Sequence, residues 1–540
     1  MAACGGGGTV YVIEPDSCAK LFVETFDDAT VTTAQIQPAA DGYPKHCKLR
    51  GTTLAGRVGF ELHVPLAGAW NGRLLMQGTG GYSGQIDPAI GGYRSLTGPG
   101  LMAEGYAVAT TDTGHTGLQR FDTYFLQFLD GSWAKNDPVA EEDFAWRGMK
   151  AATSAAQLLL HRLRGPERFR TYYVGCSGGG RIGMKMAEKA PELFDGFAIG
   201  DPPLALSRDM IRTHWNLSTV SALPLSMTKL RLLGKTALER CDALDGAADG
   251  VVSDPESCHV NPFELVCTQG DGPDCLTQNE AVAAYRIYNG PTDSQGRQVV
   301  PGLPASGAED CDGLCDDQES LGPRFREGWP WWFAGGPLSD LDAYDQPPIA
   351  LQIERTFGNV VMTEFYRYLA FDPDTDNLRW QDLDPVSNPA LLDRARALYD
   401  VNRFDFSDFR ASGKRILMYS GWGDVLVGPS SITDFRQKVV QASGGEPATS
   451  EVFRLFMVPG MQHCEGGRSL DNFDVVGALV KWVETDAAPA TLRASSRFTN
   501  VFPGRERDLC PYPQVSTYRG SGSFDDPASF ECRPRPPLQR

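Results

Sequence analysis

The sequence has a deficit of basic charge and no long apolar run. It contains 50 Lys and Arg residues against 68 Asp and Glu residues, which gives a formal net charge of −18. Phosphate backbones and anionic membrane surfaces are bound by clustered basic residues, so this deficit argues against a nucleic-acid partner. No apolar run approaches the roughly 18–20 residues of a membrane-spanning helix, so we expect no integral membrane segment. Hydrophobic residues make up 41% of the chain, enough for the large core of an acidic globular protein.

Histidine is scarce and the Cys-x-x-Cys pattern is absent. The chain has 7 histidines and 13 cysteines, and a zinc site built from Cys and His is therefore not expected. Four pairs of cysteines lie close in sequence and are predicted to form disulfides: Cys241–Cys258, Cys267–Cys275, Cys311–Cys315 and Cys510–Cys532. A Cys18–Cys47 disulfide is also predicted. This pattern is typical of an oxidising compartment, although scattered buried thiols are the alternative.

The first residues bear on localisation. Met-Ala-Ala-Cys4 is followed by four glycines, which resembles the end of a bacterial lipoprotein signal with Cys4 as the lipidated residue. The basic and apolar regions that such a signal needs do not occur here, so either the chain has been trimmed or the likeness is accidental. We expect a flexible segment at residues 1–17 and a protein that is secreted, periplasmic or held at the outer membrane as a lipoprotein.

The hydrophobic pattern alternates between strand and helix periods. Strands are predicted at 57–64, 73–77, 106–111, 171–174, 196–199, 415–419 and 452–458, and helices at 145–163, 181–190, 430–441 and 472–485. This alternation predicts an α/β fold with a mostly parallel sheet. It lapses between 204 and 412, a stretch rich in Trp, Pro, Gly and Asp. We therefore predict one α/β domain, residues 18–203 and 413–540, split by an insertion at 204–412.

The motif Gly175-Cys176-Ser177-Gly178-Gly179 follows a predicted strand and precedes a predicted helix. In this context G-x-S-x-G forms a nucleophile elbow, where small neighbours let the chain turn sharply and expose the serine. Ser177 is therefore the candidate nucleophile. A purely structural glycine turn is the alternative.

A serine nucleophile needs a base and an acid, in the chain order Ser…Asp/Glu…His for this fold. Asp424 lies just past the strand at 415–419, and His463 lies just past the strand at 452–458. Each residue alone is better explained as a loop residue, but their order and positions favour a catalytic acid and base.

Two further features support the same site. Cys176 precedes Ser177 and Cys464 follows His463. If the serine and histidine meet, these cysteines come close enough for a disulfide, which needs Cα atoms within about 7 Å. Acyl transfer also needs hydrogen-bond donors for an oxyanion, and we expect the backbone N–H groups of Gly178 and Gly81 to supply them. The alternative is that the glycine-rich turn at 78–84 is a tight connection with no role in binding.

An acidic turn lies in the insertion. Asp242, Asp245 and Asp249 alternate with glycines that let carbonyl groups turn inward, an arrangement that suits Ca²⁺. The spacing is not that of an EF-hand, and an acidic surface turn explains the composition equally well.

These motifs together resemble the tannase and feruloyl esterase family. The resemblance rests on Gly175-Cys176-Ser177-x-Gly-Gly, Asp424, His463-Cys464 and the Cys241–Gly250 turn, and it extends from about Cys18 to Cys532. It implies an α/β-hydrolase core with 204–412 as a lid domain, and a Ser177–His463–Asp424 triad above a Cys176–Cys464 disulfide. It also implies structural Ca²⁺ held by the three aspartates and by the carbonyls of Ala247 and Val251. No organic cofactor is expected.

The resemblance implies a small aromatic ester as substrate, of the feruloyl, galloyl or benzoyl type. Trp331 and Trp332 are expected to stack on the ring, with Ser420 and Val427 as further substrate-binding residues. Hydrolysis of terephthalate monoesters such as mono(2-hydroxyethyl) terephthalate is the first alternative, but no clear counterpart of a basic carboxylate clamp occurs near 355–371. An amidase or peptidase with the same triad is the second alternative. A non-enzymatic binding protein on the same scaffold is the third.

Overall fold

The computed structural model describes residues 15–22, 25–26, 28–40, 42–66, 68–86, 100–117, 128–165, 167–310, 328–334, 356–496, 502 and 504–535. Cys4, Cys311 and Cys315 lie outside these residues, so the lipidation of Cys4 and the Cys311–Cys315 disulfide stay predictions. In the described part of the chain, no helix combines the length and the apolar character needed to span a bilayer.

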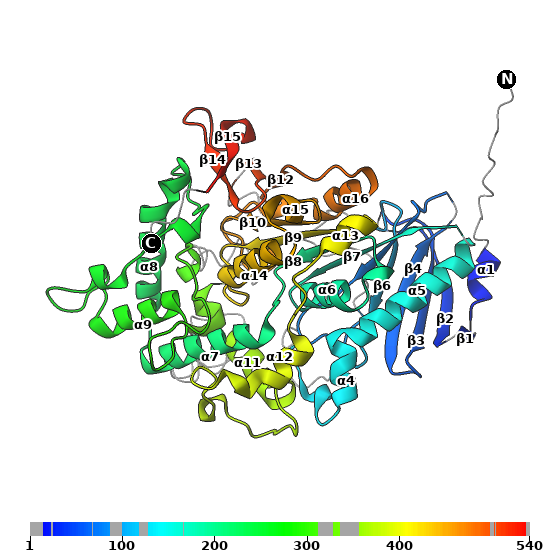
Figure 1. Ribbon diagram of the computed structural model, residues 1–540, viewed down its shortest axis with the longest axis horizontal. Coiled ribbons are helices and arrows are strands. Elements are labelled where there is room, and N and C mark those ends of the chain that lie inside the picture. The colour runs from blue at the N-terminus through cyan, green and yellow to red at the C-terminus, as the bar shows by residue number, and fades with distance from the viewer. Residues whose placement is uncertain are drawn as a thin grey trace.

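One sheet forms the centre of the molecule (Figure 1). Its ten strands, as far as the described residues go, follow the order β1-β2-β3-β4-β6-β5-β7-β8-β9-β10. They are β1 (Thr25–Phe26), β2 (Ala29–Gln37), β3 (His46–Thr53), β4 (Val58–Pro65), β5 (Arg73–Gln77), β6 (Ala107–Thr111), β7 (Arg170–Cys176), β8 (Gly196–Gly200), β9 (Arg415–Gly421) and β10 (Phe453–Val458). Strands β5 to β10 pair in parallel, and β1 to β4 form an antiparallel edge. The predicted fold class is confirmed.

Helices cover both faces of the sheet. The residues of β7 alternate between two apolar clusters: Tyr173 belongs to the cluster with Ile182 of α6 (Gly178–Lys189), and Tyr172 to the cluster with Leu479 of α16 (Val475–Thr485). Since successive side chains of a strand point to opposite faces, a strand covered on both sides reads as a continuous apolar run. This explains why the central strands were recognisable in the sequence. The other helices of the α/β part are α1 (Pro15–Ala19), α4 (Pro138–Glu142), α5 (Gly148–Arg164), α14 (Pro429–Ala442) and α15 (Glu446–Ser450).

The chain between β8 and β9 is helical, and its described residues contain no strand of the main sheet. Its helices are α7 (Leu206–Ala222), α8 (Met227–Cys241), α9 (Gln278–Asn289), α11 (Phe357–Tyr368), α12 (Asp393–Tyr399) and α13 (Ser407–Ser412). Figure 1 shows α7, α8, α9 and α11 gathered on the side of the molecule away from β1–β4. This segment agrees with the lapse of the alternating pattern after residue 203.

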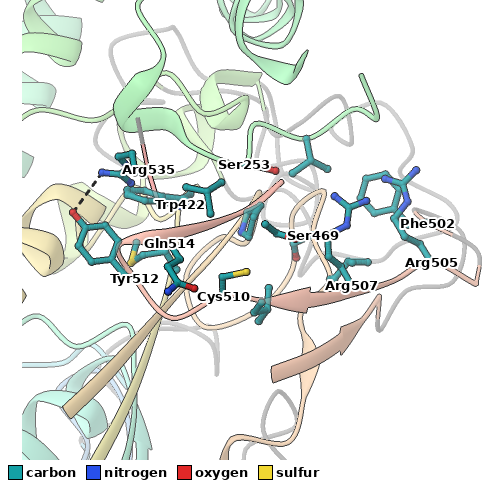
Figure 2. Close-up of a pocket in the computed structure, with 17 residues that line it drawn as sticks. Ser253, Trp422, Ser469, Phe502, Arg505, Arg507, Cys510, Tyr512, Gln514 and Arg535 are labelled. Carbon is teal, nitrogen blue, oxygen red and sulfur yellow. Dashed lines mark hydrogen bonds between the residues drawn. The ribbon is translucent and has the colours of Figure 1, made fainter. Parts of the chain in front are cut away.

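The C-terminal segment packs against this helical part. It forms β11 (Asn472–Phe473), β12 (Leu492–Ser495), β13 (Glu506–Leu509), β14 (Gln514–Tyr518) and β15 (Phe530–Pro534), with β11–β13 in one small sheet and β14–β15 in another. The Arg535 guanidinium lies 2.8 Å from the Asp254 carboxylate. A cavity of about 40 Å³ lies at this junction, and Figure 2 shows Trp422, Ser253 and Arg507 around it. The cavity is only large enough for one or two waters, and no triad residue lines it.

Candidate active site

The turn between β7 and α6 holds Ser177 in a strained backbone conformation. Its φ is 57° and its ψ is −129°, in a region that costs a non-glycine residue of order 1–3 kcal/mol. A Cβ on Gly175 would lie 2.7 Å from the backbone carbon of Gly179. Only glycine fits there, so the motif Gly175–Gly179 can make the sharp turn that the sequence predicts.

The structure brings the three predicted triad residues together. Ser177 Oγ lies 2.8 Å from His463 Nε2, and His463 Nδ1 lies 2.8 Å from Asp424 Oδ2. The other oxygen of Asp424 accepts hydrogen bonds from the backbone N–H groups of Leu426 and Val427, both at 2.9 Å. Because the carboxylate is fixed at both oxygens, it holds the imidazole with Nδ1 as donor and leaves Nε2 to accept the serine proton.

Cys176 and Cys464 are joined in a disulfide with a Cα–Cα distance of 6.1 Å. This bond ties the end of β7 to the loop that carries His463. The structure also contains four of the other predicted disulfides: Cys18–Cys47, Cys241–Cys258, Cys267–Cys275 and Cys510–Cys532.

The glycine-rich turn at 78–84 lies against the nucleophile turn. A Cβ on Gly178 would lie 2.7 Å from the Gly81 carbonyl oxygen and 3.2 Å from its nitrogen. The two backbone N–H groups predicted to bind an oxyanion are therefore on adjacent, closely packed turns.

Tyr82 anchors this turn, a role that sequence reasoning missed. Its N–H donates to the Phe128 carbonyl at 3.0 Å, its hydroxyl donates to the Val361 carbonyl at 2.9 Å, and its own carbonyl accepts from His115 Nε2 at 2.8 Å. Burial lowers the pKa of His115 to about 3, so the imidazole is neutral and its Nε2 carries the proton. The partners of Tyr82 come from three separate segments of the chain, so no sequence motif could have indicated that they position the turn around residue 81.

A cavity of about 310 Å³ opens beside Ser177 and His463. This size is typical of a small-molecule site. Its walls are aromatic: Tyr82, Phe128, Phe144, Trp331, Trp332 and Phe357. The ring of Trp332 lies edge-on to His463 at a centroid distance of 5.9 Å. Both predicted tryptophans therefore reach the cavity.

Two of the predicted substrate-binding residues do not reach it. Ser420 is fully buried, and its hydroxyl donates to Asp201 Oδ1 at 2.8 Å, because it faces β8 from the end of β9. Val427 is also fully buried, and the neighbouring Leu426 lines the cavity instead. Neither Ser420 nor Val427 lines this cavity, and their assignment to substrate binding stays a prediction.

Three charged side chains line the cavity: Arg181, Asp209 and Glu465. Burial raises the pKa of Asp209 to about 6 and lowers the pKa of Arg181 to about 10. The Arg181 guanidinium lies between the rings of Phe144 and Tyr399, at 4.9 and 5.4 Å from their centroids. The cavity thus combines aromatic walls with more acidic than basic groups.

The acidic turn has oxygen donors suited to a hard cation. Asp249 Oδ1 is buried and has no hydrogen-bond partner among the described residues, while Oδ2 pairs with Arg507 at 2.8 Å. Burial raises the pKa of Asp242 and raises that of Asp245 to about 6, so burial disfavours the charged form of both carboxyl groups. The side chains of Asp242, Asp245 and Asp249 do not converge on one point. Within the described residues, the only place where three possible metal ligands lie within 4.8 Å of one another is Cys176, Asp201 and Cys464. The residues fit Ca²⁺ by their chemistry.

Known proteins share both the sequence and the fold. The profile of the family described as tannase and feruloyl esterase matches residues 46–533. The chain is 28% identical to mono(2-hydroxyethyl) terephthalate hydrolase of Piscinibacter sakaiensis, over 99% of this chain and 92% of that protein. It is also 28% identical to a probable feruloyl esterase of Arthroderma benhamiae, over 88% of this chain and 82% of that protein.

Among solved structures, feruloyl esterase B from Aspergillus oryzae matches with a TM-score of 0.76 at 21% identity, covering 96% of this chain and all of that one. This likeness shows the α/β-hydrolase fold. Because the family profile spans nearly the whole chain, the protein belongs to the tannase and feruloyl esterase family of carboxylic ester hydrolases.

Proposed function

We propose that this enzyme cleaves esters of small aromatic acids through an acyl-enzyme on Ser177. One observation carries the proposal: the hydrogen-bonded chain from Ser177 through His463 to Asp424 opens onto a cavity with aromatic walls.

In the first half of the reaction, Ser177 Oγ attacks the ester carbonyl carbon while His463 Nε2 takes the serine proton. The tetrahedral intermediate then expels the alcohol, which receives that proton from His463 and leaves Ser177 acylated. In the second half, water gives a proton to His463 and attacks the acyl carbon, and Ser177 leaves with the proton back on its oxygen. Asp424 stabilises the imidazolium throughout and stays ionised.

The negative oxygen of each tetrahedral intermediate needs donors. The backbone N–H groups of Gly178 and Gly81 serve this role in the proposal, since the two turns pack against each other and Tyr82 anchors the second. A donor of this kind is worth about 3–4 kcal/mol of transition-state stabilisation.

The cavity favours an uncharged acyl group. Asp209 pairs with the buried Arg212 at 2.8 Å, and the other two charged residues of the lining, Arg181 and Glu465, are of opposite sign. A substrate with a free carboxylate therefore gains no net attraction from these charges and loses its hydration on entering the aromatic cavity. Esters such as methyl ferulate, methyl gallate and methyl benzoate should therefore be cleaved with higher kcat/KM than mono(2-hydroxyethyl) terephthalate. The measurement is kcat/KM for these four esters and for a matched aryl anilide. A higher kcat/KM for the terephthalate monoester would contradict the assignment of the acyl group. A higher kcat/KM for the anilide would contradict the assignment of ester hydrolysis.

Ser177→Ala tests the nucleophile. Turnover of a p-nitrophenyl or methyl aromatic ester should fall by about 10⁴-fold or more, because no other group can form the acyl-enzyme. The circular dichroism spectrum and the melting temperature should stay near those of the parent, since alanine keeps the Cβ of serine, lacks only the hydroxyl oxygen and adds no group that could clash. A fluorophosphonate probe should label the parent and not the variant. Turnover at the parental rate in a folded Ser177→Ala protein would refute the proposal.

Three supporting properties belong to the same proposal. Asp242, Asp245 and Asp249, with the carbonyls of Ala247 and Val251, would hold structural Ca²⁺, which would neutralise the buried carboxylates of the turn. The insertion would act as a lid, because Trp331, Trp332 and Phe357 come from it and cover the cavity. The disulfides support export to an oxidising compartment, as a secreted or periplasmic protein.

A further inference from the structure

A second buried carboxylate lies behind the triad. Asp201 directly follows β8 and is 0% exposed. Its Oδ1 accepts hydrogen bonds from the Ser420 hydroxyl and from the Gly421 N–H, both at 2.8 Å. Its Oδ2 accepts from the Cys464 N–H at 3.0 Å. All of these donors belong to segments that carry triad residues.

The end of β8 contacts each of the three segments. The chain runs from Gly421 to Asp424 in three residues, and Cys464 follows His463. The backbone contributes as well: the Asp201 N–H donates to the Tyr419 carbonyl at 3.0 Å, and the Ser177 N–H donates to the Gly200 carbonyl at 3.0 Å. Gly200 and Asp201 therefore connect the nucleophile turn, the acid loop and the base loop.

The surroundings of Asp201 exclude two simpler explanations. Its Oδ2 lies 3.9 Å from Cys176 Sγ, and these atoms with Cys464 Sγ form a compact group. Both sulfurs belong to the disulfide, so they are not thiolate ligands for a metal. Asp201 is also absent from the cavity lining, so it does not touch the substrate.

We propose that Asp201 is a positioning residue of the triad, which holds the Asp424 loop and the His463 loop in register through its two carboxyl oxygens. The inference rests on the proposed serine mechanism. It predicts that Asp201 affects the rate of acyl transfer and not the binding of the substrate, because it touches only the segments that carry the reacting groups.

The electrostatics agree with this role. Burial, and next the charge of Asp424, raise the pKa of Asp201, while His463 lowers it. Asp424 and His463 are the two charged or titratable groups that affect the pKa of Asp201 most. The three donors match an ionised carboxylate. If the Asp201 carboxyl group is protonated, the Ser420 hydroxyl can accept a hydrogen bond from it, so the contact between the two side chains is kept in both charge states.

The test compares three substitutions. Asp201→Ala removes every contact of the carboxyl group. Asp201→Asn keeps an acceptor toward Gly421 but turns an NH₂ group toward the Cys464 N–H. We expect kcat for an aromatic ester to fall by about tenfold to a hundredfold in both, with KM within about twofold, since small misplacements of reacting groups have costs of this size. Ser420→Ala removes one contact of three and should lower kcat by a smaller factor.

Asp400→Asn is the matched control. Asp400 is another buried aspartate, 4% exposed, and it also accepts from a backbone N–H and a serine hydroxyl, at Ser207. It contacts none of the triad loops, so its variant should lose stability while kcat stays within about twofold of the parent.

Three outcomes are decisive. If folded Asp201 variants lose no more kcat than Asp400→Asn, or if they raise KM alone, the inference is overturned. If neither Asp201 variant folds, an unchanged kcat in Ser420→Ala overturns it and a reduced kcat with parental KM supports it. Activity in Ser177→Ala would instead refute the proposed function, so the two failures are distinguishable.

Discussion

At the scale of single residues, the site depends on positions where a side chain cannot be accommodated. A Cβ on Gly179 would lie 2.7 Å from the carbonyl oxygen of Gly78, at the start of the turn that leads to Gly81. The atoms that this Cβ would meet belong to the backbone of residues 78 and 79, so they cannot rotate away as a side chain could. The close approach of the two turns therefore requires glycine at residue 179, independently of any role in binding.

Gly179→Ala should displace the turn at 78–84 and with it the Gly81 N–H. We expect kcat to fall by about 10²-fold or more, the usual effect of losing one oxyanion donor, with a smaller change in KM. The measurement is steady-state kinetics on an aromatic methyl ester. Gly272→Ala is the control, because a Cβ there meets only Cys275 Sγ at 3.8 Å. Equal kcat values for the two variants would show that the turn does not supply a donor.

At the scale of elements, the Ser177 and His463 segments are held together across a long stretch of chain. The two residues of the Ser177–His463 hydrogen bond are 286 positions apart, and the adjacent Cys176–Cys464 disulfide spans 288 positions. A disulfide that closes such a loop removes much entropy from the unfolded chain. The disulfide thus stabilises the Ser177–His463 contact on which the proposed mechanism depends.

Replacement of Cys176 and Cys464 by alanine should lower the free energy of unfolding by about 5–6 kcal/mol on the chain-entropy account. It should also lower kcat, since the His463 loop loses its tie to β7. Replacement of Cys267 and Cys275 by serine is the comparison, because that disulfide spans only 8 positions and should be worth about 2.5 kcal/mol. Denaturant unfolding and ester kinetics measure both effects. A larger loss from the shorter loop would contradict the account.

The helices and strands that could be predicted from the sequence are those with one clear hydrophobic pattern. Strand β5 was predicted with its observed bounds, because its apolar run is buried between helices. Strands β2 and β3 were missed, since both mix polar and apolar residues along an antiparallel edge. The order of Ser177, Asp424 and His463 could be predicted because each follows a parallel strand.

The lining of the cavity beside Ser177 could not be predicted in the same way. Phe128 and Phe357 line it from loops and helices that carry no motif. The sequence also does not show that the Ser420 hydroxyl donates a hydrogen bond to Asp201.

At the scale of the whole molecule, an acidic chain concentrates basic residues where its last segment meets the insertion. Figure 2 shows Arg505, Arg507 and Arg535 at this junction. Arg507 pairs with the Asp249 carboxylate at 2.8 Å in the acidic turn, and Arg535 pairs with Asp254 at 2.8 Å just beyond it. The acidic turn therefore links the insertion to the C-terminal segment, and its charge state affects how firmly the two are held.

The calcium-free turn should become less stable as the pH rises. Burial raises the pKa of Asp242 and raises that of Asp245 to about 6. Without a cation, the folded state therefore binds these protons more tightly than the unfolded state. The stability that this contributes is present below the ordinary carboxyl pKa and is lost as the pH rises through about 6. A bound cation would favour the ionised carboxylates and would reverse this loss.

Chelation should therefore lower the melting temperature more at about pH 7.5 than at about pH 5, because Ca²⁺ competes with protons for the same oxygens. Asp249→Asn should remove most of this difference, since it takes a charge from the turn while keeping an acceptor oxygen. Asp254→Asn is the control: that carboxylate is also buried and paired with an arginine, but it lies outside the proposed ligand set. Scanning calorimetry with and without a chelator, together with metal analysis of the purified protein, provides the measurement. A chelator effect that is equal at both pH values, or that persists in Asp249→Asn, would place the cation elsewhere in the molecule.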